Sequence, residues 1–222
     1  AIAELGYEVN EVARGLKTKK TMTIGIVIPE LNNIFCTTII SIVEDILRVH
    51  GYATIVCDCR TDEQLEQQAI SFLLKKQVDG IINMPVSQSG DHLKLAVDKK
   101  IPIVLIDRKI SDIKCDCVVV DNITASRDAV NRLISQGHRN IGIICGPQDI
   151  FTAQERLTGY QIAHLENGLL PNTNYITIGD YTIEGGMNCF KKLITENSDI
   201  TAVFVTNYEL TIGSIIALNE MG

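Results

Sequence analysis

The chain has 222 residues, of which 45% are hydrophobic and 21% are charged, and its formal net charge at pH 7 is −7. This composition is typical of a globular protein with one large domain or two small ones, and it excludes collagen-like and disordered classes. No apolar run approaches the roughly 20 residues that a membrane-spanning helix needs, so no membrane partner is expected.

The charge is unevenly distributed. Residues 14–20 contain four basic side chains and no acidic one, which makes a compact place for phosphate contacts near the beginning of the chain. The rest of the chain is acidic and is not expected to bind DNA by itself. A basic segment of this length is also common on ordinary solvated surfaces, so it decides nothing alone.

The chain has seven cysteines, an odd number, and some lie in strand-like apolar runs, as Cys145 does. This usage favours free thiols in the reducing cytoplasm over a disulfide framework. The pairs Cys57/Cys59 and Cys115/Cys117 do not predict a metal site, because alternate strand residues point to opposite faces and no histidine accompanies them at zinc spacing. We therefore expect a cytoplasmic protein without metal or cofactor.

From residue 23 onward, short apolar runs alternate with amphipathic helical stretches. The predicted strands are 23–28, 53–58, 80–84, 103–107, 117–121, 140–145, 175–178 and 202–206. Apolar stripes at helical spacing lie between them, at 39–49, 65–73, 130–134, 157–165 and 187–194. The continuous apolar strands and repeated alternation predict an α/β fold with doubly wound parallel sheets.

The run 118–122, followed at once by a predicted helix over 125–136, indicates where the chain leaves one lobe and enters another. We expect an N-terminal lobe at 21–121 and a C-terminal lobe at 122–222, each of an ordinary domain size. Ligands of such sheets bind beyond the carboxyl ends of the strands, so the loops there are the candidate site.

The sequence carries no phosphate-loop, dinucleotide-binding, zinc-protease or α/β-hydrolase motif, so catalysis is not predicted. The four histidines, His50, His92, His138 and His164, are interpreted as surface or helix-cap residues. None of them has a recognisable nucleophile partner in the sequence.

Side chains suited to a polyol follow the predicted strands. They are Asn33, Phe35, Asp107, Arg108, Arg156, Tyr181 and Asn207. Amides, carboxylates and guanidinium groups bind hydroxyls directionally, and aromatic rings stack on the C–H faces of sugars. Each residue taken singly is equally suited to a turn or a cap, but their convergence on one rim favours a binding site.

Several segments together resemble the end of the headpiece, the hinge and the core of LacI/GalR-family repressors. They are 1–7, 10–17, 20–29, 77–82, 101–108, 120–122, 137–142, 156–160, 179–181 and 202–207. The resemblance implies two periplasmic-binding-protein-like lobes that close over an effector, in a homodimer that binds operator DNA. It also implies that residues 1–20 are the end of the headpiece and a hinge helix, and that the chain is truncated at both ends relative to the family.

Residue by residue, Leu16 matches the family's hinge leucine, which wedges between base pairs in the minor groove, with Ala13 and Lys17 beside it. The rim residues above match the effector sites of ribose-binding-type relatives, and Thr152 lies where some members touch effector. A pentose or small hexose is the implied ligand class.

Departures from the family pattern leave the exact ligand open. Cys36 stands where many relatives have a second aromatic residue, and Tyr208 replaces a common aspartate. Ile150 and Phe151 give the loop after residue 146 an apolar wall where a purine-binding relative has an arginine.

Two other classes remain open. A transport receptor for sugars would have the same fold, and an α/β enzyme of unrecognised type is the third reading. The hinge-like run 13–17 and the odd number of cysteines favour the regulator, and Glu4 lies where a secretory signal would be basic or apolar. A secretion signal upstream in the full gene would favour the receptor.

Overall fold

The computed structural model describes residues 20–222, and the chain divides into one compact unit that ends at Val119 and a second unit from Val120 to Gly222. The hinge residues Ala13, Leu16 and Lys17 lie outside the described residues. No described helix is both long and apolar enough to cross a membrane.

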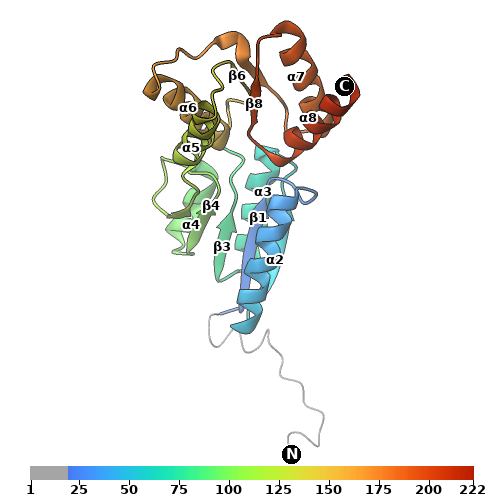
Figure 1. Ribbon diagram of the computed structural model, residues 1–222. Coiled ribbons are helices and arrows are strands. Elements are labelled where there is room, and N and C mark those ends of the chain that lie inside the picture. The colour runs from blue at the N-terminus through green and yellow to red at the C-terminus, as the bar shows by residue number, and fades with distance from the viewer. Residues whose placement is uncertain (1–19) are drawn as a thin grey trace, which may run out of the picture. The chain divides into compact units, whose positions relative to one another are not determined.

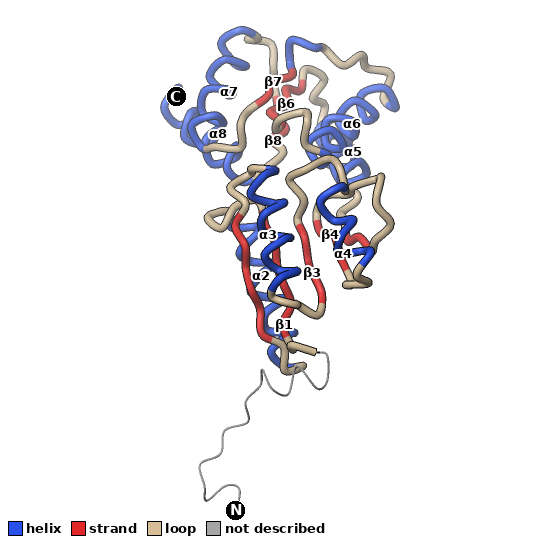
Figure 2. The backbone as a smooth tube through the Cα atoms, turned by 180° about the vertical axis from the view of Figure 1, so that it is seen from behind, coloured by secondary structure: helices blue, strands red, loops and turns tan. Residues whose placement is uncertain are grey.

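The N-terminal lobe is built on a five-stranded parallel sheet of order β2-β1-β3-β4-β5 (Figures 1 and 2). Its strands are β1 (Thr23–Ile28), β2 (Ala53–Asp58), β3 (Gly80–Asn83), β4 (Ile103–Ile106) and β5 (Asp116–Val118). Its helices are α2 (Ile34–Val49), α3 (Glu63–Lys75), the short 3-10 helix η2 (Asp91–Leu93) and α4 (Lys94–Asp98).

Both faces of this sheet are covered, because successive residues of a buried strand point to opposite sides. On β1, Val27 packs with α3, whereas Ile26 and Ile28 pack with Cys36 of α2. Figure 1 shows α2 in front of the sheet, and the reverse view in Figure 2 shows α3 in front. The continuous apolar strands of the sequence are explained by this double coverage.

The C-terminal lobe has a three-stranded parallel sheet of order β7-β6-β8. Its strands are β6 (Ile141–Cys145), β7 (Ile176–Ile178) and β8 (Ala202–Val205). Its helices are α5 (Asn122–Ser135), α6 (Phe151–Glu166), the short 3-10 helix η3 (Thr173–Tyr175), α7 (Ile183–Glu196) and α8 (Tyr208–Met221). Helices α5 and α6 cover one face of β6, and α7 and α8 cover the other.

Glycines allow the two helix pairs of this lobe to approach closely. A Cβ on Gly159 of α6 would overlap the carbonyl oxygen of Ile123 in α5, and one on Gly213 of α8 would overlap that of Ile183 in α7. These contacts place the first turn of α5 directly against α6, which matters for the site described below.

The predicted fold class, α/β with two parallel sheets, is confirmed. The predicted strand 117–121 is wrong beyond residue 118, because β5 pairs only with β4 and the chain leaves the sheet at exposed Val119 and Val120. Helix α5 begins at Asn122, earlier than predicted, because the Asp121 side chain accepts a hydrogen bond from the Thr124 backbone N–H and caps its amino terminus.

Candidate functional site

Four of the predicted site residues lie at the carboxyl end of the N-terminal sheet. Asn33 and Phe35 follow β1, and Asp107 and Arg108 follow β4. The electrostatics of Cys36, next to Phe35, indicate that these two segments are neighbours. Burial raises the pKa of the Cys36 thiol, the Asp107 charge raises it further, and the Arg108 charge lowers it.

Three successive roles are found at the start of α2: a helix cap, an exposed aromatic ring and a core position. Asn33 is the amino-terminal cap, and its Oδ1 accepts from the backbone N–H groups of Phe35 and Cys36 at 3.0 and 3.2 Å. Phe35 keeps 47% of its surface exposed, so its ring is accessible. Cys36 packs into the core, so this position faces the sheet.

Asp107 and Arg108 form the turn after β4. Asp107 has φ of 68°, a left-handed conformation that costs a residue other than glycine about 1–3 kcal/mol and that clusters at functional sites. Arg108 Nη1 donates to the Pro85 carbonyl at 3.2 Å, and its Nε lies 3.7 Å from an Asp107 carboxylate oxygen. The guanidinium is therefore held between its own turn and the loop after β3.

The loop after β3 is fixed by a buried carboxylate that the sequence analysis did not single out. Glu66 of α3 is fully buried, and its Oε2 accepts from the backbone N–H groups of Val86 and Ser87 at 3.0 and 2.8 Å. Its Oε1 accepts from Asn83 Nδ2 at 2.8 Å, and His92 Nε2 lies 3.1 Å away. Burial raises the pKa of Glu66, but the contacts with His92, Asn83 and Ser87 outweigh it and lower the pKa overall.

Two histidines correct the sequence interpretation. The His92 side chain is only 2% exposed because it packs against Glu66, so it is neither a surface nor a cap residue. His164 is buried in α6, where its Nδ1 lies 2.9 Å from the Tyr160 carbonyl oxygen. The sequence did not reveal either placement, because the partner of His92 comes from another helix, whereas the Tyr160 carbonyl that satisfies His164 lies within the same buried helix.

In the C-terminal lobe, the guanidinium group of Arg156 is held by two hydrogen bonds to other elements. Its Nε donates to Asn122 Oδ1 at 3.1 Å, and its Nη1 donates to the Thr206 carbonyl oxygen at 2.9 Å. Within residues 20–222, no protein acceptor is found for Nη2. The guanidinium is thus fixed on one side and has donors to offer on the other.

Asn122 and Glu155 complete this anchor, and the sequence analysis missed both roles. Asn122 is 5% exposed, and its Nδ2 donates to Glu155 Oε2 at 2.9 Å and to the Val120 carbonyl oxygen at 3.1 Å. The sequence showed that Asn122 lies near the start of a helix and that Glu155 precedes Arg156. Their mutual contact depends on the close pairing of α5 with α6.

The side chains of Tyr181 and Thr152 are less exposed to solvent than the prediction of a ligand contact assumes. Tyr181 has φ of 63°, its ring packs over Gly146, and it joins the apolar cluster beneath α7 and α8. Thr152 is only 3% exposed, so it offers little surface to a ligand in this conformation.

Asn207 is the amino-terminal cap of α8. Its Oδ1 accepts from the Leu210 backbone N–H at 2.9 Å, and its Nδ2 donates to Glu209 at 2.7 Å. The cap role that the sequence left open for the predicted rim residues therefore holds for Asn207, as it does for Asn33.

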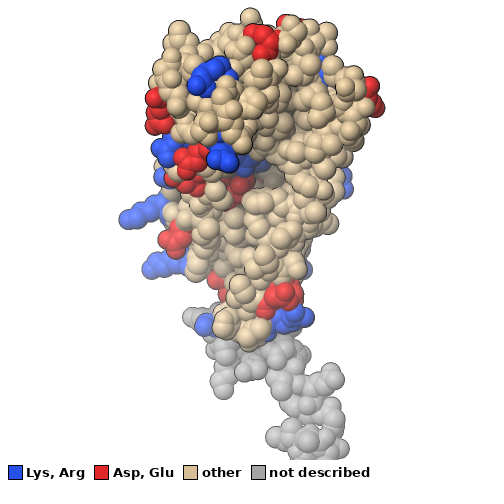
Figure 3. Space-filling model, viewed as in Figure 1, with Lys and Arg blue, Asp and Glu red and all other residues tan. Residues whose placement is uncertain are grey.

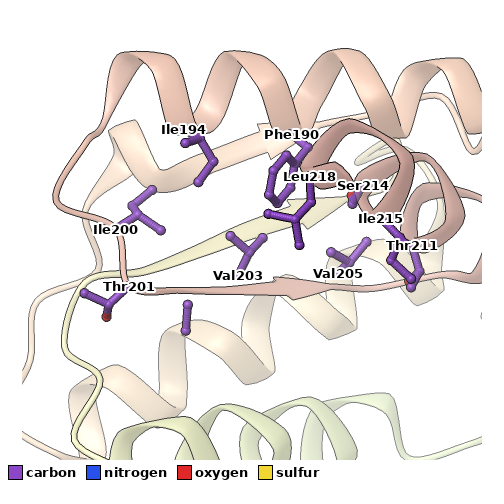
Figure 4. Close-up of a pocket in the computed structure, with 11 residues that line it drawn as sticks. Phe190, Ile194, Ile200, Thr201, Val203, Val205, Thr211, Ser214, Ile215 and Leu218 are labelled. Atoms are coloured by element: carbon purple, nitrogen blue, oxygen red, sulfur yellow. The ribbon is translucent and has the colours of Figure 1, made fainter. Parts of the chain in front are cut away.

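The C-terminal lobe also has an apolar groove of about 450 Å³ between β8, α7 and α8 (Figure 4). Figure 4 shows Phe190, Ile194, Val203 and Leu218 around it. Polar lining is confined to a few hydroxyls, so the groove cannot satisfy the many hydroxyls of a polyol. The rim around Arg156 is the better candidate for such a ligand.

In the part of the chain that the structure describes, neither a disulfide nor a cluster of metal-ligating side chains forms a second candidate site. All seven cysteines are free. Residues 20–222 contain no cluster of histidine, cysteine and acidic side chains that could hold a metal ion.

Comparison with known proteins identifies the class. Residues 21–222 match the family model described as periplasmic binding proteins and sugar binding domain of the LacI family, and the chain belongs to this family. It is 35% identical over its whole length to catabolite control protein A of Priestia megaterium, of which it spans 67%. It is also 32% identical over its whole length to the ribose operon repressor of Haemophilus influenzae, of which it spans 66%.

Among solved structures, the complex of the transcriptional regulator CelR with cellobiose matches with a TM-score of 0.80 at 28% identity, covering 100% of this chain and 67% of that one. The chain thus spans about two thirds of the length of these relatives. The relatives are transcription regulators and not enzymes, so the predicted family and non-enzymatic class are confirmed.

Proposed function

We propose that the chain is the effector-binding region of a transcription repressor and that it binds a pentose or small hexose. The observation that carries this proposal is the anchoring of Arg156, whose Nε and Nη1 are held by protein acceptors while Nη2 has none among the described residues. A fixed guanidinium offers directional donors to sugar oxygens. One relative is named for the ribose operon and another is a complex with the disaccharide cellobiose, so both names support a sugar as the ligand, and the first supports a pentose.

The proposed effector contacts lie at the carboxyl ends of the strands in each lobe. They are Asn33, Phe35, Asp107, Arg108, Thr152, Arg156, Tyr181 and Asn207. In this proposal the amide, carboxylate and guanidinium groups bind hydroxyls, and the exposed Phe35 ring covers a C–H face. Thr152 and Tyr181 need a local rearrangement to take part, because both are largely packed inward.

We also propose that the complete protein acts on operator DNA in the cytoplasm. The hinge match at Ala13, Leu16 and Lys17 supports this role, as does the basic run at residues 14–20. In this proposal effector binding changes DNA affinity because the effector binds one conformation of the two lobes better than another.

A thermal-shift screen tests the effector proposal. The panel contains D-ribose, other pentoses, hexoses, their phosphates and purines, because a ligand bound only by the native state raises its stability. A ligand at about 100 times its Kd adds about 2.7 kcal/mol. The proposal expects a shift with a sugar and loss of that shift in Arg156→Ala. A shift with a purine alone, or silence with every sugar, would contradict it.

The homodimer is part of the same proposal. Helix α2 presents an apolar stripe of Ile42, Ile46 and Val49, which are 56%, 56% and 83% exposed. Figure 3 shows few charged side chains over this face of the N-terminal lobe, apart from a group toward the lower end of α2. Exposed apolar patches of this kind mark interaction surfaces, and a second copy buries the same patch on both subunits.

Analytical ultracentrifugation of the chain tests the dimer. Ile46→Glu is expected to shift a dimer to monomer, because it places a charge in the apolar stripe, whereas Gln68→Glu on α3 serves as the control because it adds the same single negative charge. A wild-type chain that sediments as a monomer at all concentrations would refute this use of α2.

A further inference from the structure

We infer that Asn122, together with Glu155, is a positioning residue that sets the direction of the Arg156 guanidinium and thereby the affinity for effector. This inference rests on the proposed function, because it assigns Arg156 to the effector site. It concerns residues that neither the sequence pattern nor the relatives' names assign to any role.

The partners of Asn122 leave its amide only one orientation. Nδ2 faces the Glu155 carboxylate and the Val120 carbonyl oxygen, both of which can only accept hydrogen bonds. Oδ1 faces the Arg156 Nε–H, which can only donate. A flipped amide would put like groups together at all three contacts. Asn122 is therefore a rigid acceptor for Arg156.

The backbone around Asn122 is equally constrained. The Val120 carbonyl oxygen accepts from both the backbone N–H of Asn122, at 2.9 Å, and its side chain. Asp121 caps the helix that begins at Asn122, and Gly159 brings α6 against this turn. The acceptor thus sits on a fixed turn, at the place where the chain enters the second compact unit.

Two anchors leave one direction for the remaining donors of Arg156. Nε is held by Asn122 and Nη1 by the Thr206 carbonyl oxygen, in the residue before the proposed contact Asn207. Losing the Asn122 anchor lets the guanidinium turn about its last side-chain bonds. A ligand then has to restrict that motion itself, which weakens its binding.

The closing experiment compares Asn122→Asp with the double variant Asn122→Asp/Glu155→Gln. The single change keeps an acceptor oxygen for Arg156 but replaces the Nδ2 donor by an oxygen, which is repelled by Glu155 and by the Val120 carbonyl oxygen, so the acceptor is no longer held in place. In the double variant the new amide at position 155 donates to the new carboxylate at position 122. That donation holds the carboxylate as the acceptor for Arg156 again, while the Val120 contact stays broken. Asn131→Asp, in the same helix, is the matched control because its Oδ1 still accepts from Asn167.

The first readout is the Kd for D-ribose, measured by calorimetry on the 222-residue chain. Asn122→Asp is expected to weaken binding about tenfold, and the double variant is expected to recover most of that loss. The melting temperature should stay lowered in the double variant because of the Val120 contact. Affinity that simply follows the melting temperature across the variants would overturn the inference.

The second readout needs no ligand. The Arg156 Nε–H resonance, assigned by its loss in Arg156→Lys, should exchange slowly with solvent in wild type and in the double variant but fast in Asn122→Asp. Unchanged exchange in Asn122→Asp would overturn the inference. If wild type does not bind D-ribose, the proposed ligand fails, and the exchange measurement still decides whether Asn122 positions Arg156.

Discussion

Glu66 offers the strongest test of how the N-terminal rim is held together. Glu66→Ala removes the acceptor of the Val86 and Ser87 backbone N–H groups and of Asn83 Nδ2, and it leaves His92 without its contact. Each buried donor left unsatisfied costs about 1–3 kcal/mol, so the loss of the three hydrogen bonds together costs about 3–9 kcal/mol. For a unit of this size, 1 kcal/mol corresponds to about 4–8 °C, so Tm falls by at least about 12 °C.

The matched control is Glu66→Gln, which keeps the shape of the side chain. Asn83 Oδ1 is buried and has no hydrogen-bond partner among residues 20–222. A flip of the Asn83 amide therefore lets it accept from the new Gln amide while the two backbone donors keep their acceptor. The expected loss is about 1–2 kcal/mol, clearly less than that of the alanine variant.

The pH dependence of stability provides a second test of the Glu66 carboxylate. The pKa of Glu66 is lowered in the folded chain, so its stabilising effect is present above its unfolded pKa of about 4.3 and is lost as the pH falls through the folded value. Urea unfolding at about pH 5 and about pH 3 should show a steeper loss of stability in wild type than in Glu66→Gln. Equal losses, or equal Tm values for wild type and Glu66→Ala, would refute the reasoning.

Three further predictions follow from packing. Gly159→Ala drives a Cβ into the facing helix and should destabilise the C-terminal lobe by about 1–3 kcal/mol, measured by urea unfolding, with unchanged stability as the contrary result. Gly146→Ala displaces the Tyr181 ring that packs over the backbone of Gly146 and should make tyrosine fluorescence more sensitive to acrylamide quenching, but not in a Tyr181→Phe background; no change in either background would contradict the placement of the ring. Burial raises the pKa of Cys59 to about 12 and that of Cys145 to about 11, so both thiols should resist iodoacetamide at neutral pH until the chain is unfolded, as checked by mass spectrometry.

The strands were the most predictable part of the molecule. A strand covered on both faces reads as a continuous apolar run, and β1 and β2 begin and end where the sequence places them. The length of the edge strand β5 was overestimated at its carboxyl end. The apolar run continues with two valines after residue 118, although these residues pair with no neighbouring strand. Apolar character alone does not show whether a partner is present.

The site was predictable residue by residue but not contact by contact. Arg108 follows from its place after a strand, and Arg156, which lies in α6, follows from the family resemblance, whereas the groups that hold them do not. Glu66 reaches the loop after β3 and Asn122 reaches α6 only through tertiary packing. The sequence carries no local signal for these contacts, because Glu66 and Asn122 both look like ordinary helix residues.

The most direct test of the central claim is a calorimetric titration of wild type and Arg156→Ala with the sugar that gives the largest thermal shift. A sugar that binds wild type at one site and binds Arg156→Ala at least about tenfold more weakly is the predicted result. Because Arg156 bonds to Asn122 and to the Thr206 carbonyl, the Tm of the variant is measured alongside. Equal affinity in the two proteins would contradict the assignment of the effector site to the rim around Arg156.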